Sequence, residues 1–196
     1  PKRAVLLNPN RNQTKPFTYR LLKRMGGKYL ILATIATQVL TNLLIVPMAA
    51  VIQSNADLTA DQFSASVWMT LLLVSISNAV LLLSVFLMSR NAYRRLEQYR
   101  RQQTLSRNTT EEHNAWREIT ALPWRYSLAA ILTSFLIVMA PLIAYQYFAL
   151  QLNTDQIGYA VLGGTVSAFA IVAAGAIGIE RLLLPAGEIL LPASFE

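Results

Sequence analysis

Four long stretches of this sequence contain no Asp, Glu, Lys, Arg or His. They run from Tyr29 to Gln53, from Ser64 to Ser89, from Tyr126 to Leu150 and from Ile157 to Ile179. A helix needs about 20 apolar residues to cross the roughly 30 Å of hydrocarbon in a bilayer, and each stretch is longer than that. The stretches do not alternate between apolar and polar residues, which excludes membrane β-strands. We therefore expect four transmembrane helices.

The composition of the chain limits its chemistry. Charged residues make up 14% of the sequence, about half of the roughly 25% found in soluble domains. The chain has no Cys, which excludes disulfides, thiolate metal sites and cysteine nucleophiles. Its single His, His113, lies outside the four stretches, which excludes a bis-His haem or a His-ligated chlorophyll within the bilayer. We predict no enzyme activity, no metal and no cofactor beyond bound lipid, and leave open a pigment held by water, backbone carbonyls, Asn or Gln.

The basic residues predict the topology. All 17 Lys and Arg precede the first stretch, separate the second from the third, or follow the fourth. The two short loops on the other side carry only Asp57, Asp61 and Asp155. With seven acidic residues on the basic side, its charge is +10, against −3 on the loop side. By the positive-inside rule, both termini lie in the cytoplasm of a bacterium or on the equivalent face of a thylakoid.

The same charges indicate membrane lipids rather than nucleic acid as the partner of the basic segments, because anionic headgroups attract Lys and Arg near a membrane surface. Six basic residues are expected to contact lipid headgroups or a partner protein: Arg20, Lys23, Arg24, Lys28, Arg94 and Arg95.

The two halves of the chain are similar. A shift of 94 residues places Pro47 on Pro141 and Asp61–Gln62 on Asp155–Gln156. The approach to the second proline, Thr133–Pro141, matches that to the first with two residues inserted. We interpret the halves as two parallel repeated hairpins, the alternative being chance matches between apolar hairpins. The prolines predict helix kinks, interpreted as shared geometry in preference to a signalling hinge.

Small and amide side chains within the stretches predict contacts between helices. Small residues recur at every fourth position of the last stretch, which indicates close packing on this bundle or on another subunit. These residues are Ala160, Gly164, Ala168, Ala170, Ala174 and Gly178. Gln38, Asn42 and Asn78 are expected to form interhelical hydrogen bonds in preference to binding a ligand. The lack of ionisable groups at membrane depth argues against a transporter or pump.

The connector at 90–125 reads as two helices. The first, Arg90–Gln103, is expected to continue the second span, and the next to begin near Thr109 and end at Pro123. His113 lies near Glu111, Glu112 and Glu118, a set that we interpret as a solvated face in preference to a metal site. The expected segments are a basic N-terminal segment (1–28), a first hairpin (29–89), the connector (90–125), a second hairpin (126–184) and a C-terminal segment (185–196).

The C-terminal segment carries a resemblance. Arg181 follows the last stretch, and Pro185 is followed four residues later by Ile189, which resembles the start of a HAMP-type signalling linker. The sequence Leu122-Pro-Trp-Arg-Tyr126 is similar to the membrane domains of bacterial sensors such as membrane adenylate cyclases. The resemblance implies a dimeric membrane module that feeds a cytoplasmic output domain, with no catalytic residue carried over.

Two functions are therefore expected. The first is a non-enzymatic membrane domain that anchors a cytoplasmic output domain and relays signals to it. The second is a structural or accessory subunit of a larger photosynthetic or respiratory membrane complex. Both imply contacts with other transmembrane helices, in a homodimer or in that complex.

Overall fold

The chain is all-helical in the computed structural model, which describes residues 17–45, 47–48, 51, 55–102 and 109–192. Within these residues there is no strand. The helices are α1 (Phe17–Met25), α2 (Lys28–Asn42), α4 (Ala60–Met88), α5 (Arg90–Gln102), α6 (Thr109–Thr133), the π-helix η2 (Ser134–Met139), α7 (Ala140–Phe148) and α8 (Thr154–Ile189). Much of the expected basic N-terminal segment (1–16), six connector residues (103–108) and the last four residues (193–196) lie outside the described part.

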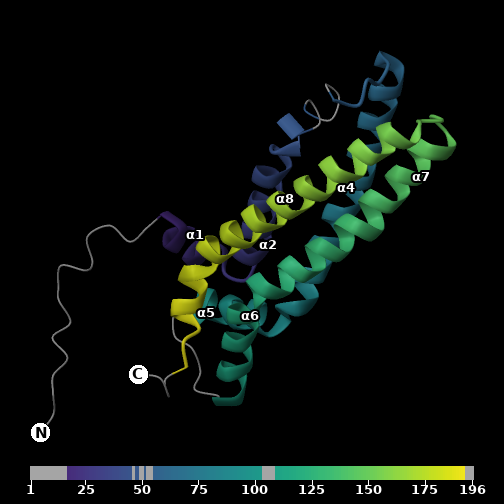
Figure 1. The fold of residues 1–196 in the computed structure, drawn as a ribbon. Coiled ribbons are helices and arrows are strands. Elements are labelled where there is room, and N and C mark those ends of the chain that lie inside the picture. Colours follow the sequence, from purple (N-terminus) through teal and green to yellow (C-terminus); the bar gives the residue numbers. More distant parts are fainter. Residues whose placement is uncertain (1–16, 46, 49–50, 52–54, 103–108, 193–196) are drawn as a thin grey trace, which may run out of the picture.

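Three helical rods are long and apolar enough to cross a membrane (Figure 1). They are Ala60–Met88, Thr110–Phe148 and Thr154–Ile189, and they include nearly all of the second and third uncharged stretches and the whole of the fourth. At 1.5 Å per residue, α4 is about 44 Å long and α8 about 54 Å, so both exceed the hydrocarbon thickness of roughly 30 Å. The all-α, membrane-type architecture expected from the sequence is thus confirmed.

The first uncharged stretch is not one straight helix. α2 ends at Asn42, Leu43 and Leu44 form a turn, and helical residues resume at Ile45. The break lies four residues before Pro47, whose ring conflicts with the carbonyl of Leu43 and which has no N–H to donate. Leu43 is 63% exposed, so no packing offsets this cost. That the first stretch also crosses the membrane, and so gives a fourth span, therefore stays a prediction.

Two expectations about the connector are wrong. α6 runs without interruption through Pro123, so the second connector helix and the third apolar stretch form one rod. Ile119 and Leu122 are almost fully buried beside this proline, and their packing holds the helix together.

Conversely, α5 does not continue α4. The backbone leaves the helical region at Ser89 (φ −113°, ψ 22°), where the side-chain hydroxyl donates to the Val85 carbonyl at 2.7 Å.

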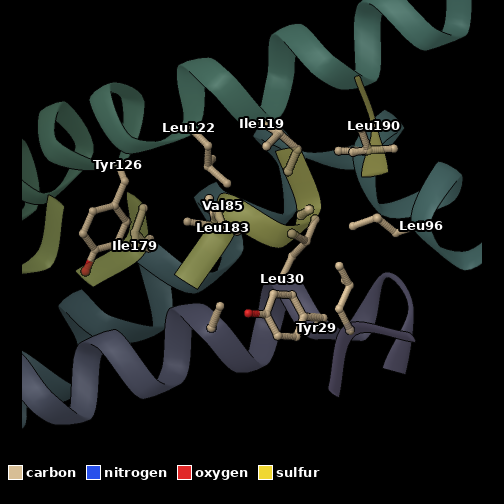
Figure 2. Packing of buried hydrophobic residues seen from close by; sticks show 14 of the residues in the cluster. Tyr29, Leu30, Val85, Leu96, Ile119, Leu122, Tyr126, Ile179, Leu183 and Leu190 are labelled. Atoms are coloured by element: carbon tan, nitrogen blue, oxygen red, sulfur yellow. The ribbon is translucent and has the colours of Figure 1, made fainter. Parts of the chain in front are cut away.

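The main core lies at one end of the bundle, called the basic end below. Here α1, α5, the start of α6 and the end of α8 pack around the start of α2 and the end of α4 (Figure 1). Figure 2 shows side chains from these helices pointing toward one another. Fully or almost fully buried members are Leu22, Tyr29, Leu30, Val85, Ala92, Leu96, Ala115, Ile119, Leu122, Tyr126, Ile179, Leu183, Ala186 and Leu190.

α8 continues into this core past the end of its apolar stretch. Pro185, expected to begin a separate linker, lies inside α8 and is buried. The Tyr29 hydroxyl donates to the Leu182 carbonyl at 2.6 Å, close to the carbonyl of Arg181 that the proline leaves without its usual helical donor. The last turns of α8 are therefore held on α2 at the basic end by this hydrogen bond.

The opposite end, called the loop end below, contains two similar turns. Asp57 and Gln151 both have positive φ, 46° and 51°. Two residues later, Thr59 and Asn153 begin α4 and α8 with capping boxes completed by Gln62 and Gln156. The loops also contact each other through two side-chain donors: Gln62 Nε2 to the Leu150 carbonyl at 3.4 Å, and Gln156 Nε2 to the Asp57 carbonyl at 3.3 Å.

Candidate functional site

A cavity of about 190 Å³ lies inside the bundle, between α2, α4, the η2–α7 segment and α8. Its lining runs along α4 from Phe63 to Leu81, which corresponds to about 27 Å of helix. Most lining side chains are apolar. The polar ones include Asn42, Ser66, Ser77, Asn78, Ser134 and Gln146. No Asp, Glu, Lys, Arg or His lines the cavity, so the site favours a neutral occupant.

Gln146 contributes a buried polar atom without a partner in the described part of the chain. Its side chain is 4% exposed, and Nε2 donates to Ser66 Oγ at 3.4 Å. Its Oε1 has no hydrogen-bond partner among the described residues. A buried acceptor without a donor costs about 1–3 kcal/mol, which a bound donor could recover. The sequence analysis singled out three other amides but not this one, although an isolated Gln in an apolar stretch was the available signal.

Two features of the neighbouring helices make room for the cavity. Ser134–Met139 form a π-helix, a wider turn that is frequent at functional sites, directly before Pro141 at the start of α7. Opposite it, Ala160, Gly164 and Ala168 of α8 present small side chains to the cavity. A Cβ added to Gly164 would lie 3.4 Å from Met139 Cε.

The remaining small residues of α8 serve different contacts. Gly178 lies against α2, where an added Cβ would be 3.3 Å from Thr37 Cγ2. Gly175, which lies outside the expected rows, lies against α6, with an added Cβ 3.0 Å from Tyr126 Cε1. Ala170 and Ala174 are half-buried.

The amides predicted between helices lie near one another. Gln38 Nε2 donates to the backbone carbonyl of Asn78 at 3.0 Å and so joins α2 to α4. Asn42, one helical turn after Gln38, and Asn78 both line the cavity. Of the two prolines, Pro47 is exposed beside the break after α2, and Pro141 follows the π-helix.

At the basic end, one expected headgroup contact is corrected. Arg95 is 3% exposed and points into the protein, where it donates to Glu112 Oε1 at 2.8 Å. Glu111 lies 3.6 Å from the same guanidinium group. Burial among α5 and α6 therefore removes Arg95 from the lipid-contact set. The other five members are exposed: Arg20, Lys23, Arg24, Lys28 and Arg94.

Glu118 caps α5 from a distant part of the sequence. Its carboxylate accepts the backbone N–H groups of Asn91 and Ala92, both at 2.9 Å, and the Asn91 side-chain amide at 2.6 Å. The two backbone N–H groups belong to the first turn of α5, where such groups lack a partner within the helix. Glu112 and Glu118 thus hold α5 on α6, so the interpretation as a solvated face is wrong for both. Across the described residues, no three His, Asp or Glu side chains are grouped as metal ligands would be.

A third carboxylate, that of Glu97, lies against the turn between α1 and α2. Hydrogen bonding from Arg100, with further help from Arg101, lowers the pKa of Glu97 below its usual range. Gly26 faces this group with φ +58°, and an added Cβ would lie 2.7 Å from Glu97 Oε2. Only glycine adopts that backbone conformation without strain.

Searches against protein-family models, curated proteins and solved structures find no match to this chain.

Proposed function

We propose that this chain is the membrane domain of a signalling protein, with four membrane-crossing segments and the basic end in the cytoplasm. One observation carries the proposal: α8 is a single helix that begins at the loop end, passes the cavity and ends in the core of the basic end. About 24 Å of its roughly 54 Å exceeds the hydrocarbon thickness. A displacement at the loop end can therefore reach the C-terminal segment through one rigid element.

The internal repeat is part of the proposal, and burial supports it. The shift of 94 residues relates the two positive-φ turn residues and the two capping boxes at the loop end. It also relates buried positions of the basic end, each at most 2% exposed. These pairs are Val85 and Ile179, Ala92 and Ala186, and Leu96 and Leu190. A duplicated hairpin explains why α2 and α6 each pack against both α4 and α8.

The relay would work by a shift of α4 and α8 relative to α2 and α6. Such a shift responds to a ligand only if that ligand binds the two arrangements with different affinities. The shift would take place at the close contacts of Gly175 with Tyr126 and of Gly178 with Thr37, where α8 packs on α6 and on α2.

Topology can be tested with single cysteines, because the chain has no native Cys. Lys23→Cys, Asp61→Cys, Arg94→Cys and Asp155→Cys place thiols at exposed positions of both ends. With a membrane-impermeant maleimide on intact cells, the Asp61 and Asp155 variants should be labelled. The Lys23 and Arg94 variants should react only after permeabilisation. Labelling of Lys23→Cys from the Asp61 side would show that the first stretch does not cross.

The relay role has its own test. The coding sequence beyond Glu196 should continue into a cyclase, kinase or methyl-accepting domain. A stop codon there would contradict the relay and favour the second candidate, an accessory subunit of a larger membrane complex. The observation that favours this second candidate is the set of large exposed side chains around the bundle, such as Trp68, Trp124 and Phe148. Co-purification with a multi-subunit complex from native membranes would support it.

A further inference from the structure

We propose that the cavity binds a neutral, hydroxyl-bearing, single-chain amphiphile, with its hydroxyl group donating to Gln146 Oε1. The proposal requires that the apolar rods lie in a membrane, and it holds or fails independently of the relay role. Its starting point is the Gln146 side chain, which lines the cavity and whose buried oxygen has no hydrogen-bond partner among the described residues.

Three of the hydroxyl groups that line the cavity are already used as hydrogen-bond donors. The hydroxyl groups of Thr41, Thr70 and Ser167 each donate to a backbone carbonyl of their own helix, at 2.6–3.1 Å. Their oxygen lone pairs, like Gln146 Oε1, can still accept. A hydroxyl group of the ligand supplies the missing donor. Because a hydroxyl also accepts, it fits Gln146 with either assignment of the amide oxygen and nitrogen.

The shape and orientation of the cavity favour a chain-like molecule. Gln146 and Ser66 lie toward the loop end, near the end of α7 and the start of α4. From there the lining continues toward the basic end past apolar side chains such as Val74, Val138 and Val172. A polar group near the membrane surface with an apolar chain directed inward is the arrangement of a lipid in the outer leaflet.

The volume limits the size of the occupant. A cavity of about 150 Å³ holds benzene, which has six heavy atoms, so one of about 190 Å³ takes roughly eight. A medium-chain alcohol is of this size. Charged lipids are disfavoured, because the lining has no charged group to compensate a buried charge.

The proposal is tested with two photoreactive probes on the purified full chain in nanodiscs: a diazirine analogue of 1-octanol and the matching analogue of octane. Labelled residues are mapped by mass spectrometry, with and without excess 1-octanol. The alcohol probe should label lining residues such as Val74, and excess 1-octanol should remove that label. The octane probe should label those residues at least fivefold less, a ratio that one hydrogen bond supplies.

Two variants separate the hydroxyl contact from the cavity itself. Gln146→Leu should reduce labelling by the alcohol probe at least fivefold and leave octane labelling unchanged. It should not lower the thermal midpoint, because it removes a buried oxygen without a donor. Ala160→Leu should fill part of the cavity and reduce labelling by both probes, whereas Ala173→Leu, on the exposed face of the same helix, should change neither.

Three results would overturn the proposal. Equal cavity labelling by the two probes would show that the hydroxyl group is not recognised. Labelling confined to lipid-facing residues such as Leu72 and Leu83 would show that nothing but water enters the cavity. Unchanged labelling in both Gln146→Leu and Ala160→Leu would place the bound probe elsewhere.

Discussion

Replacing Glu118 by Ala should loosen the docking of α5 on α6. The Glu118 carboxylate accepts three hydrogen bonds at the start of α5, two from backbone N–H groups and one from the Asn91 side chain. Loss of an N-terminal cap costs roughly 0.5–2 kcal/mol, and loss of a negative charge at a helix N-terminus roughly 0.3–1 kcal/mol. The site is partly exposed, so we take about 1–2 kcal/mol as the total.

The assay is thermal unfolding of the detergent-purified chain followed by circular dichroism. For a chain of this length, about 1–2 kcal/mol corresponds to a decrease of roughly 2–8 °C in Tm. Glu118→Gln should lie between wild type and Glu118→Ala, because the amide oxygen still accepts but the charge is lost. Glu180→Ala removes the same charge from an exposed position of α8 and should leave Tm nearly unchanged.

A double-mutant cycle isolates the contact. Asn91→Ala removes only the side-chain donor, so its effect should be smaller in the Glu118→Ala background than in the wild type. The reasoning is refuted if Glu118→Ala changes Tm no more than Glu180→Ala does, or if the two substitutions of the cycle are additive.

Three further predictions concern packing at the basic end and between α8 and α2. Gly26→Ala should lower stability by about 2 kcal/mol in the same assay, because its φ of +58° strains any Cβ and this one would lie 2.7 Å from Glu97 Oε2. The pKa of Glu97 is lowered, chiefly by hydrogen bonding from Arg100. The ionised Glu97 therefore stabilises the folded chain above the ordinary pKa of 4.5, and this stabilisation is lost as the pH falls through the lowered pKa. The Tm difference between wild type and Glu97→Gln should accordingly shrink between pH 6 and pH 3. Gly178→Leu should cost about 1–3 kcal/mol by forcing α8 away from Thr37, and a Tm equal to wild type would refute that close contact.

Sequence reasoning predicted the helical class because charge-free stretches of this length have few alternatives in a bilayer. It was less successful with prolines. Pro47 interrupts its helix, whereas Pro123 and Pro185 lie inside continuous ones. The difference is packing. Leu43 and Leu44 before Pro47 are exposed, whereas Leu122 beside Pro123, and Leu183 and Ala186 beside Pro185, are buried in the core of the basic end. A local rule about proline cannot include that tertiary contribution.

The same limit applies to charges and to the cavity. The sequence shows that Arg95 is basic but not that Glu112, 17 residues away, pairs with it on a neighbouring helix. The cavity depends on side chains from four separate segments and on a π-helix. No periodicity of the sequence predicts either of them. What the sequence did provide was an unusual amide, since Gln146 lies in a stretch otherwise suited to lipid.

The two halves of the proposed repeat differ in a way that bears on the relay. In the first half, α4 stops at Ser89, and α5 turns away to pack on α6, where Glu118 caps it. In the second half, the corresponding residue is Leu183, and α8 passes through it without a break. A displacement of α4 can therefore be absorbed at Ser89, whereas a displacement of α8 is carried to Leu190 at its end. On the relay proposal, α4 and α8 shift together, but only α8 carries the shift to its end at the basic end, so α8 is the output element.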